Sequence, residues 1–282
     1  MTPLLMGVLL LCTVPSAHAQ DYTTHLSKEF TLPHQAEVSV LSVYNISGSV
    51  KVEGYDGNKV LMEIEETISS DDADELEKGK REVQLGFVQQ GDTLMAYMTG
   101  PHDSRPDYRC CQNDRKNIHY RYQIDYTIKV PFAMNLDVST VNNGAIVVHS
   151  VGGSLNISNV NNRIELTGVK GTTHAGTVNG GITVSYVTNP PGASYFNTVN
   201  GVIRVSCPKD FSADVQFKSM HGDLYTDFDN TELQDNVVVQ KKDADGNNTY
   251  KLDKLTGVRF GKGGKLCRFQ TLNGNVYIQK QS

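Results

Sequence analysis

Thr177-Val178-Asn179-Gly180-Gly181-Ile182-Thr183-Val184 is one copy of a short sequence that recurs along the second half of the chain. Further full or partial copies begin at Thr140, Asn159, Thr198, Ser219 and Thr271. A strand-turn-strand unit repeated in this way typically builds a stack in which each copy packs on its neighbours. The chain is therefore predicted to be mainly β and to form a β-solenoid of short strands.

The spacing of the copies indicates which side chains form the core. The aliphatic residues before the corner stand at positions 141, 160, 178, 199 and 220, which gives intervals of 19, 18, 21 and 21 residues. These marker residues are expected to share strand parity with the residues four and six positions later and to face one core with them. The residues four positions later are Ile164, Ile182, Ile203, Leu224 and Val276, and those six positions later are Leu166, Val184, Val205 and Ile278. The residue five positions after the marker is expected to face water. This position holds Glu165, Thr183, Arg204, Tyr225 and Tyr277.

Asn and Gly residues in the middle of the copies are predicted to form the corner between two strands. Both residue types tolerate the positive φ that a tight turn can require. Asparagines stacked at successive corners can also hydrogen-bond along the stack. His221 stands where the other copies have Asn, so we interpret it as a corner substitution rather than as a catalytic base.

The N-terminus is predicted to be a secretory signal peptide over residues 1–19. These residues contain no Asp, Glu, Lys or Arg. The apolar run Leu4–Leu11 is too short to span a bilayer, and Ala17-His18-Ala19 is a small-x-small cleavage site before Gln20. Lipidation through Cys12 is an alternative that the bulky preceding residue disfavours. No later apolar stretch approaches ~18 residues, so we expect no transmembrane span and a location in the periplasm or on the cell surface.

Residues 20–130 are predicted to be an N-terminal β portion, continuous with a solenoid region over residues 131–282. Acidic residues early and basic residues late predict one short helix over about residues 70–81, capped by Ser70 or Asp71. Residues 100–117 contain no aliphatic side chain and are expected to form an exposed excursion.

Four cysteines follow the predicted signal peptide: Cys110, Cys111, Cys207 and Cys267. An even number of cysteines in an exported protein suggests disulfides, although the sequence does not define the pairing. Free thiols are the alternative. A metal site is disfavoured because the adjacent pair is not C-x-x-C.

Composition and motifs argue against several functions. The net charge of −5 argues against a nucleic-acid partner. Zero Trp weakens a sugar-binding aromatic platform, but 13 Tyr keep it open. We identify no catalytic residues, since neither a Gly-x-Ser-x-Gly nor a His-Glu-x-x-His motif occurs. Residues 261–265 are glycine-rich but lack P-loop spacing, so a turn is expected there. No cofactor is expected.

A weak calcium candidate comprises Asp243, Asp245 and Asn247, which offer alternating oxygen ligands. The segment lacks the closing bidentate acid of an EF-hand loop. A hairpin turn at Asp245-Gly246 is therefore the preferred interpretation.

Several segments resemble, in order, the DUF4097 family of bacterial exported proteins, whose members are labelled as adhesins. They are the strand Gly48-Ser49-Val50-Lys51-Val52, the acidic helix, the strand from Tyr120 to Pro131 and the Asn-Gly repeats, so the resemblance runs over roughly residues 36–280. It implies a β-solenoid-like fold and an envelope location. It implies no catalytic residues, and the excursion at 100–117 departs from the family pattern.

The expected function is a non-enzymatic exported protein of the cell envelope or surface, a binding module whose partner is an envelope protein or a glycan. One alternative is a β-solenoid glycan-active lyase or hydrolase, which would need paired carboxylates roughly 5–10 Å apart. The outward positions of the repeat hold one acid, Glu165, and one base, Arg204. Another alternative is a structural or stress-related envelope protein without a small ligand. Any site is expected in the 100–117 excursion or on the outer faces.

Overall fold

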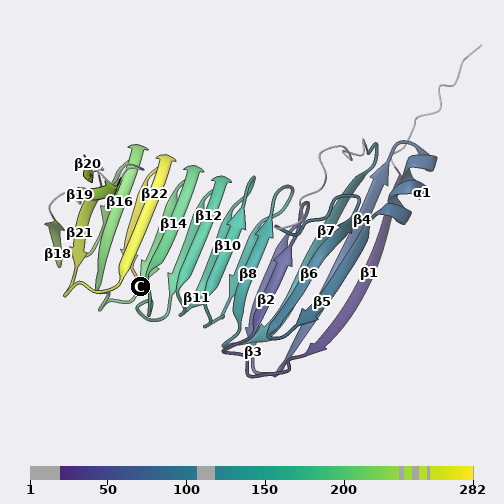
Figure 1. Cartoon of the computed structure of the whole chain (residues 1–282), viewed down its shortest axis with the longest axis horizontal. Coiled ribbons are helices and arrows are strands. Elements are labelled where there is room, and N and C mark those ends of the chain that lie inside the picture. The colour runs from purple at the N-terminus through teal and green to yellow at the C-terminus, as the bar shows by residue number, and fades with distance from the viewer. Residues whose placement is uncertain (1–19, 107–117, 235–237, 243–247, 253–254, 282) are drawn as a thin grey trace, which may run out of the picture.

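The computed structural model describes residues 20–106, 118–234, 238–242, 248–252 and 255–281. Two long sheets pack face to face along one stack, and the single helix of the described part lies at one end (Figure 1). The structure confirms a mainly β, solenoid-like fold. The predicted signal peptide lies outside the described residues.

Sheet A has ten strands and sheet B has eleven. Across sheet A the order is β1 (Gln20–Thr31), β4 (Lys59–Ser70), β7 (Arg121–Pro131), β3 (Val50–Tyr55), β9 (Ile146–His149), β11 (Ile164–Val169), β13 (Ile182–Tyr186), β15 (Ile203–Cys207), β23 (Val276–Lys280) and β17 (Leu224–Thr226). Across sheet B the order is β18 (Thr231–Gln234), β21 (Thr256–Phe260), β16 (Ala213–His221), β22 (Leu266–Asn273), β14 (Ser194–Asn200), β12 (Thr173–Asn179), β10 (Leu155–Asn159), β8 (Asn135–Thr140), β2 (Val40–Tyr44), β6 (Thr93–Gly100) and β5 (Gln84–Gln90). A separate hairpin pairs β19 (Val238–Lys242) with β20 (Asn248–Leu252).

Each solenoid coil gives one strand to sheet B and, after the Asn corner, one strand to sheet A. Strands β12 and β13 are the two halves of one such coil, and β14 and β15 are the halves of the next. Neighbouring coils pair in parallel with equivalent residues opposite each other, as Ile182 is opposite Ile203. Because of this register, the side chains at one position of the repeat lie next to each other along the stack.

The core positions after the corner are as predicted. The side chains four and six positions after the marker aliphatic are buried at Ile164, Leu166, Ile182, Val184, Ile203, Val205, Val276 and Ile278. The residues between them point away from the core, as the alternating burial of β13 and β15 shows. Leu224 is only half-buried, because β17 is the edge strand of sheet A.

The marker aliphatic residues do not face the core, so that part of the prediction is wrong. Val178, Val199, Leu272 and Met220 are 39%, 36%, 40% and 71% exposed. The corner lies between each marker and the following strand, and a chain that turns from one sheet into the other does not keep one strand parity. The threonine before the marker faces inward instead.

The inward threonines close the core beneath the corners. The hydroxyl groups of Thr140, Thr177 and Thr198 donate to corner carbonyl oxygens of Gly48, Asn162 and Gly180, respectively. These three donors are buried, so each hydrogen bond satisfies a hydroxyl that would otherwise be costly to bury. Thr, rather than Val, is therefore the core residue of the Thr-Val-Asn-Gly sequence.

The corner asparagines form the expected hydrogen-bonded ladder. Side-chain amides link Asn161 to Asn142 at 2.7 Å, Asn179 to Asn161 at 2.9 Å, Asn200 to Asn179 at 2.9 Å and Asn273 to Asn200 at 2.7 Å. His221 ends the ladder, with its Nδ1 3.1 Å from Asn273 Oδ1. The histidine is thus a corner substitution, as the sequence suggested.

Close approach of neighbouring backbones is one reason for glycine at the corners. A Cβ on Gly180 would lie 2.2 Å from the carbonyl oxygen of Asn162, and a Cβ on Gly201 would lie 1.9 Å from that of Gly180. Neither glycine has a φ in the left-handed region. The predicted positive φ occurs at other corners, namely at Asn143 with 59°, Gly48 with 121° and Gly274 with 159°, so each of the two reasons applies at some corners.

The last copy of the repeat is inserted between two earlier copies. Strand β22 lies between β14 and β16, and β23 lies between β15 and β17. Asn273 consequently bonds Asn200 on one side and contacts His221 on the other. The order of the stack therefore differs from the order of the chain at its C-terminal end.

The N-terminal β portion joins the stack through β2 and β3, which pair in parallel with β8 and β9. The helix α1 (Ala73–Glu82) begins three residues later than expected because β4 continues to Ser70, so neither Ser70 nor Asp71 is its N-cap. Its N-cap is Asp72, whose carboxylate accepts from the backbone N–H groups of Asp74 and Glu75. Among the described helices none has both the length and the apolar character needed to cross a membrane.

Candidate functional site

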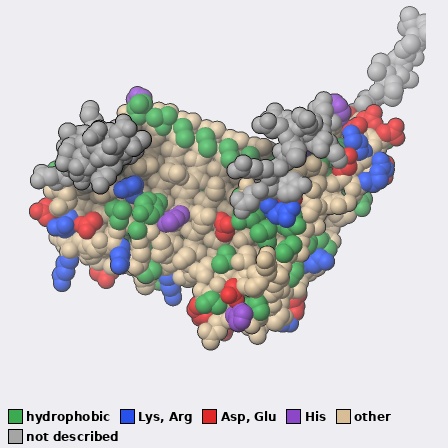
Figure 2. All heavy atoms as spheres, viewed as in Figure 1, with side chains coloured by type: hydrophobic (Ala, Val, Ile, Leu, Met, Phe, Trp, Pro, Cys, Tyr) green, Lys and Arg blue, Asp and Glu red, His purple; other side chains and the backbone are tan. Residues whose placement is uncertain are grey.

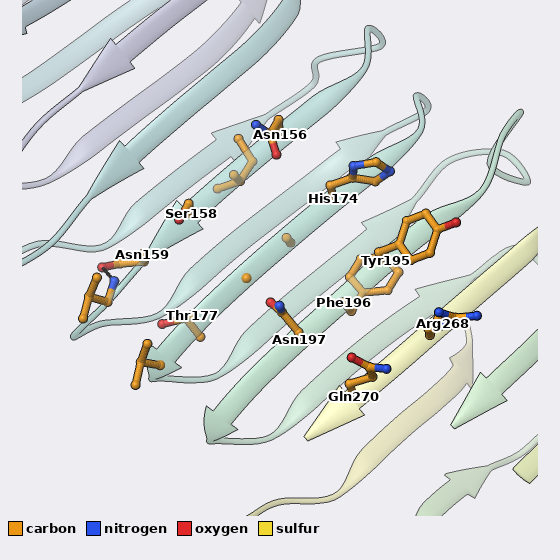
Figure 3. A pocket seen from close by; sticks show the side chains of 15 residues that line it. Asn156, Ser158, Asn159, His174, Thr177, Tyr195, Phe196, Asn197, Arg268 and Gln270 are labelled. Carbon is orange, nitrogen blue, oxygen red and sulfur yellow. Dashed lines mark hydrogen bonds between the residues drawn. The ribbon is translucent and has the colours of Figure 1, made fainter. Parts of the chain in front are cut away.

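The outer face of sheet B carries aligned rows of side chains across five strands of the solenoid. Parallel pairing places His174 of β12 opposite Tyr195 of β14, and Tyr195 opposite Arg268 of β22. Figure 3 shows these three side chains side by side on neighbouring strands. One row of residues, which we call the aromatic row, comprises Asn156, His174, Tyr195, Arg268 and Gln216.

Tyr195 is the centre of the aromatic row and is 38% exposed. The His174 ring meets the Tyr195 ring edge to face, with the centroids 4.9 Å apart and an interplanar angle of 81°. The guanidinium carbon of Arg268 lies 5.9 Å from the Tyr195 centroid on the other side. Arg268 Nε and Nη2 donate to Gln216 Oε1 at 3.0 and 2.7 Å. These contacts hold the phenol ring between two neighbours and leave part of it open to solvent.

A second row, nearer the corners, forms the floor of a shallow groove. It comprises Ser158, Gly176, Asn197, Gln270 and Lys218. Gly176 has no side chain to fill the space, and a Cβ there would lie 2.2 Å from Asn197 Oδ1. The Asn197 amide therefore lies over the glycine. Residues from β10, β12, β14 and β22 line a groove of about 530 Å³ at this place.

The exposed marker aliphatics form the rim of the groove, which we call the apolar rim. It comprises Val178, Val199, Leu272 and Met220, one from each of four adjacent strands. A hollow of about 740 Å³ runs beside them and shares Thr177, Val178, Asn197 and Gln270 with the first groove. The two hollows are thus continuous. Figure 2 shows this part of the face as mostly uncharged, with a row of hydrophobic side chains along its upper rim.

The groove offers hydrogen-bonding groups and an exposed aromatic ring. Among the residues that the structure describes, those lining it offer the amides of Asn156, Asn197 and Gln270, the ring of Tyr195 and the guanidinium of Arg268, and none of them has a carboxylate. Glycoside hydrolysis generally needs a pair of carboxyl groups on either side of the scissile bond. Amides and hydroxyls can donate and accept hydrogen bonds, while an exposed ring offers an apolar surface for stacking.

Sheet A presents a smaller aromatic group on the opposite face. Tyr225 and Tyr277 stack with their centroids 5.1 Å apart and an interplanar angle of 14°. The Arg204 guanidinium carbon lies 5.2 Å from the Tyr277 centroid. Arg204, Tyr225 and Tyr277 line none of the grooves described above. Tyr225 and Arg204 are therefore matched controls for Tyr195 and Arg268.

The site residues suggested by the sequence lie elsewhere. Cys207 and Cys267 are buried free thiols in the structure, whereas Cys110 and Cys111 lie outside the described residues, so their pairing stays a prediction. The calcium candidate Asp243, Asp245 and Asn247 also lies outside them. Within the described ranges, no group of three or more His, Cys, Asp or Glu could hold a metal ion.

The two other segments that the sequence singled out are partly or fully described. Residues 261–265 form the turn between β21 and β22, as predicted. Of the 100–117 excursion, only residues up to 106 are described, and there the Arg105 guanidinium pairs with Asp103 at 2.6 Å. Ser104 ties this segment back to the sheet by donating to the Tyr44 carbonyl oxygen at 2.7 Å. Neither segment contributes to the groove.

The residues of the groove were missed in the sequence, although a signal was present. Each member of the aromatic row stands five positions before a corner residue, and each member of the second row stands three positions before it. Our prediction followed only the outward position after the corner, which belongs to sheet A. Aligning the segments before the corner would have placed His174, Tyr195 and Arg268 in one row.

Comparisons with known proteins find one family model and several solved structures of low sequence identity. A search among curated proteins finds no relative. The chain resembles a "putative cell adhesion protein" from Clostridium sporogenes ATCC 15579 at 11% identity and a TM-score of 0.42, over 92% of this chain and 100% of that one. It resembles a "putative adhesin" from Bacteroides fragilis NCTC 9343 at 9% identity and a TM-score of 0.37, over 92% and 97%.

A third solved structure with this likeness is a "putative lipid binding protein" from Parabacteroides distasonis ATCC 8503, at 11% identity and a TM-score of 0.25, over 92% and 97% of the two chains. The family model called Toastrack DUF4097 matches residues 112–257. That match covers the central coils, their corner ladder and most of the groove, so the chain belongs to the Toastrack DUF4097 family.

Proposed function

We propose that the protein is a non-enzymatic, exported binding module that holds a glycan chain in the groove on sheet B. The observation that carries the proposal is the partly exposed Tyr195 ring, held between His174 and Arg268 beside a floor of amide side chains. Sugar rings offer hydroxyl groups to amides and apolar C–H faces to an aromatic ring. The predicted signal peptide supports export to the periplasm or the cell surface.

The shape of the groove favours an extended ligand over a compact one. The rows run across adjacent parallel strands, which lie about 4.8 Å apart. Side chains that can hydrogen-bond therefore follow one another along the stack axis, and a polymer lying across the strands would meet such groups on successive strands. The apolar rim along one side would cover the less polar edge of such a chain.

Calorimetric titration of the purified protein with a panel of neutral and acidic polysaccharides tests this proposal. We expect saturable binding to at least one class, and Tyr195→Ala should weaken it by about tenfold, which corresponds to about 1.4 kcal/mol. Tyr225→Ala is the matched control, because it removes an exposed tyrosine from the opposite sheet. Equal loss in both variants, or no binding to any glycan, would refute the proposal.

The same incubations separate binding from catalysis. A binding module leaves the polysaccharide intact, so we expect neither new reducing ends nor unsaturated products. Product formation that disappears on substitution of a single acid would favour the alternative of a glycan-active enzyme.

A further inference from the structure

We infer that the ligand of the sheet B groove is an acidic glycan, and that a ligand carboxylate pairs with Arg268. The inference rests on the proposed function and adds the chemical class of the glycan. It is drawn from the charges around the groove and from the partners of this arginine.

The groove differs in charge from the chain as a whole. The chain has 31 acidic and 26 basic side chains, so it carries a net negative charge. The described residues that line the two hollows nevertheless include Arg268 and His174, and none of these described residues is Asp or Glu. An anionic chain would therefore be repelled by much of the surface and attracted to this groove.

Arg268 has neutral partners only, unlike several other arginines in the described part of the chain. Arg105, Arg163 and Arg259 each lie within 4 Å of a carboxylate. Arg268 instead donates two N–H groups to the amide oxygen of Gln216 and lies beside the Tyr195 ring. A guanidinium carries five N–H donors, so three remain for a ligand.

The geometry of the Arg268 side chain suits a ligand carboxylate. The Gln216 amide and the tyrosine ring restrict the side chain, which lowers the entropy lost when a ligand binds. The remaining N–H groups of a planar guanidinium match the two oxygens of a carboxylate. A uronic acid presents such a carboxylate on a sugar ring that can stack on Tyr195.

The nearest acid in the same row orients the ligand. Asp137 of β8 lies next to Asn156, and its carboxylate oxygens accept from Asn156 Nδ2 at 2.7 Å and from the Tyr44 hydroxyl at 2.5 Å. The aromatic row thus has a carboxylate beyond its β10 end and a cation toward its β16 end. We therefore place the ligand carboxylate at β22 and uncharged hydroxyls over Asn156.

The test compares acidic polysaccharides with their carboxyl-reduced counterparts, which keep the backbone and lose the charge. Polygalacturonate, alginate and hyaluronan are the probes, titrated against the wild type, Arg268→Gln and Arg204→Gln. Arg204 is the matched control, because it also lies beside a tyrosine but on sheet A. Unchanged melting temperatures show that the variants are folded.

We expect the wild type to bind at least one acidic polymer about tenfold more tightly than its reduced counterpart at low salt, and the preference to shrink at high salt. Arg268→Gln should abolish the preference, whereas Arg204→Gln should retain it. Equal binding of acidic and reduced polymers, or a preference that survives in Arg268→Gln, would overturn the inference. If neutral polymers then still bind in a Tyr195-dependent way, the proposed function stands; if no polymer binds, both fall.

Discussion

The asparagine ladder offers a quantitative test of how the coils hold together. Asn179 is an interior member: its Nδ2 donates to Asn161 at 2.9 Å, and its Oδ1 accepts from Asn200 at 2.9 Å. Asn179→Ala removes both bonds. Each is a neutral, exposed hydrogen bond with a net value of about 0.5–1 kcal/mol, so we expect a loss of about 1–2 kcal/mol.

Asn142→Ala is the matched control, because this terminal member only accepts one side-chain bond, from Asn161. The expected loss is half as large, about 0.5–1 kcal/mol. Asn179→Asp keeps the acceptor but replaces the donor by a carboxylate facing Asn161 Oδ1. We therefore expect it to cost at least as much as Asn179→Ala at neutral pH.

Urea unfolding measures these differences. With an m-value of about 3 kcal/mol/M, Asn179→Ala should lower the midpoint by about 0.3–0.7 M and leave m unchanged. The reasoning is refuted if the interior and terminal variants lose the same stability. It is also refuted if neither differs from the wild type by more than about 0.3 kcal/mol.

Three further predictions concern the corners, the thiols and one acid. Gly201→Ala should lower the free energy of unfolding, measured by thermal unfolding, by at least about 2 kcal/mol, since its Cβ would lie 1.9 Å from a carbonyl oxygen. Gly152→Ala should be tolerated, because the corresponding distance is 3.4 Å, and equal effects of the two substitutions would contradict the close approach as the cause. Burial raises the pKa of both Cys207 and Cys267, for Cys267 to about 12, so iodoacetamide should label these thiols only after denaturation. Mass spectrometry detects the label, and equal labelling of the native and the denatured protein would contradict the burial of the thiols. Burial also raises the pKa of Glu66 above 4.5, so the folded state holds this proton more tightly and its stability falls as the pH rises through the raised pKa. Glu66→Gln should therefore gain more stability over the wild type at about pH 7 than at about pH 4, as measured by urea unfolding, and an equal gain at both would refute the cause.

The repeated sequence was sufficient to predict the fold class, the inward positions after each corner and the asparagine ladder. Those features depend on local alternation, which one copy shows, and on equivalent residues stacking in register, which follows from the repetition of the copies. Ile182 and Ile203 face the core for the same reason. The exposed Val178 was mispredicted because the corner between two sheets interrupts the alternation.

Two features depend on tertiary packing and could not be derived from the repeat alone. The last copy, with Asn273 at its corner, matches the ladder as well as the copy with His221, so the local pattern does not say which of them stacks on Asn200. The groove likewise needs Tyr195 and Arg268, which are 73 positions apart, to become neighbours through this insertion. Their chemistry becomes a site only once the order of the strands is known.

Because the sequence contains no tryptophan, a single introduced tryptophan can report directly whether the sheet B groove is the ligand-binding surface. Tyr195→Trp places a single tryptophan in the aromatic row, and Tyr225→Trp places one at the 46% exposed tyrosine of sheet A. Fluorescence titration with the neutral and acidic polysaccharides should give a saturable change in emission for Tyr195→Trp and none for Tyr225→Trp. A response from Tyr225→Trp alone, or equal responses from both, would contradict the account.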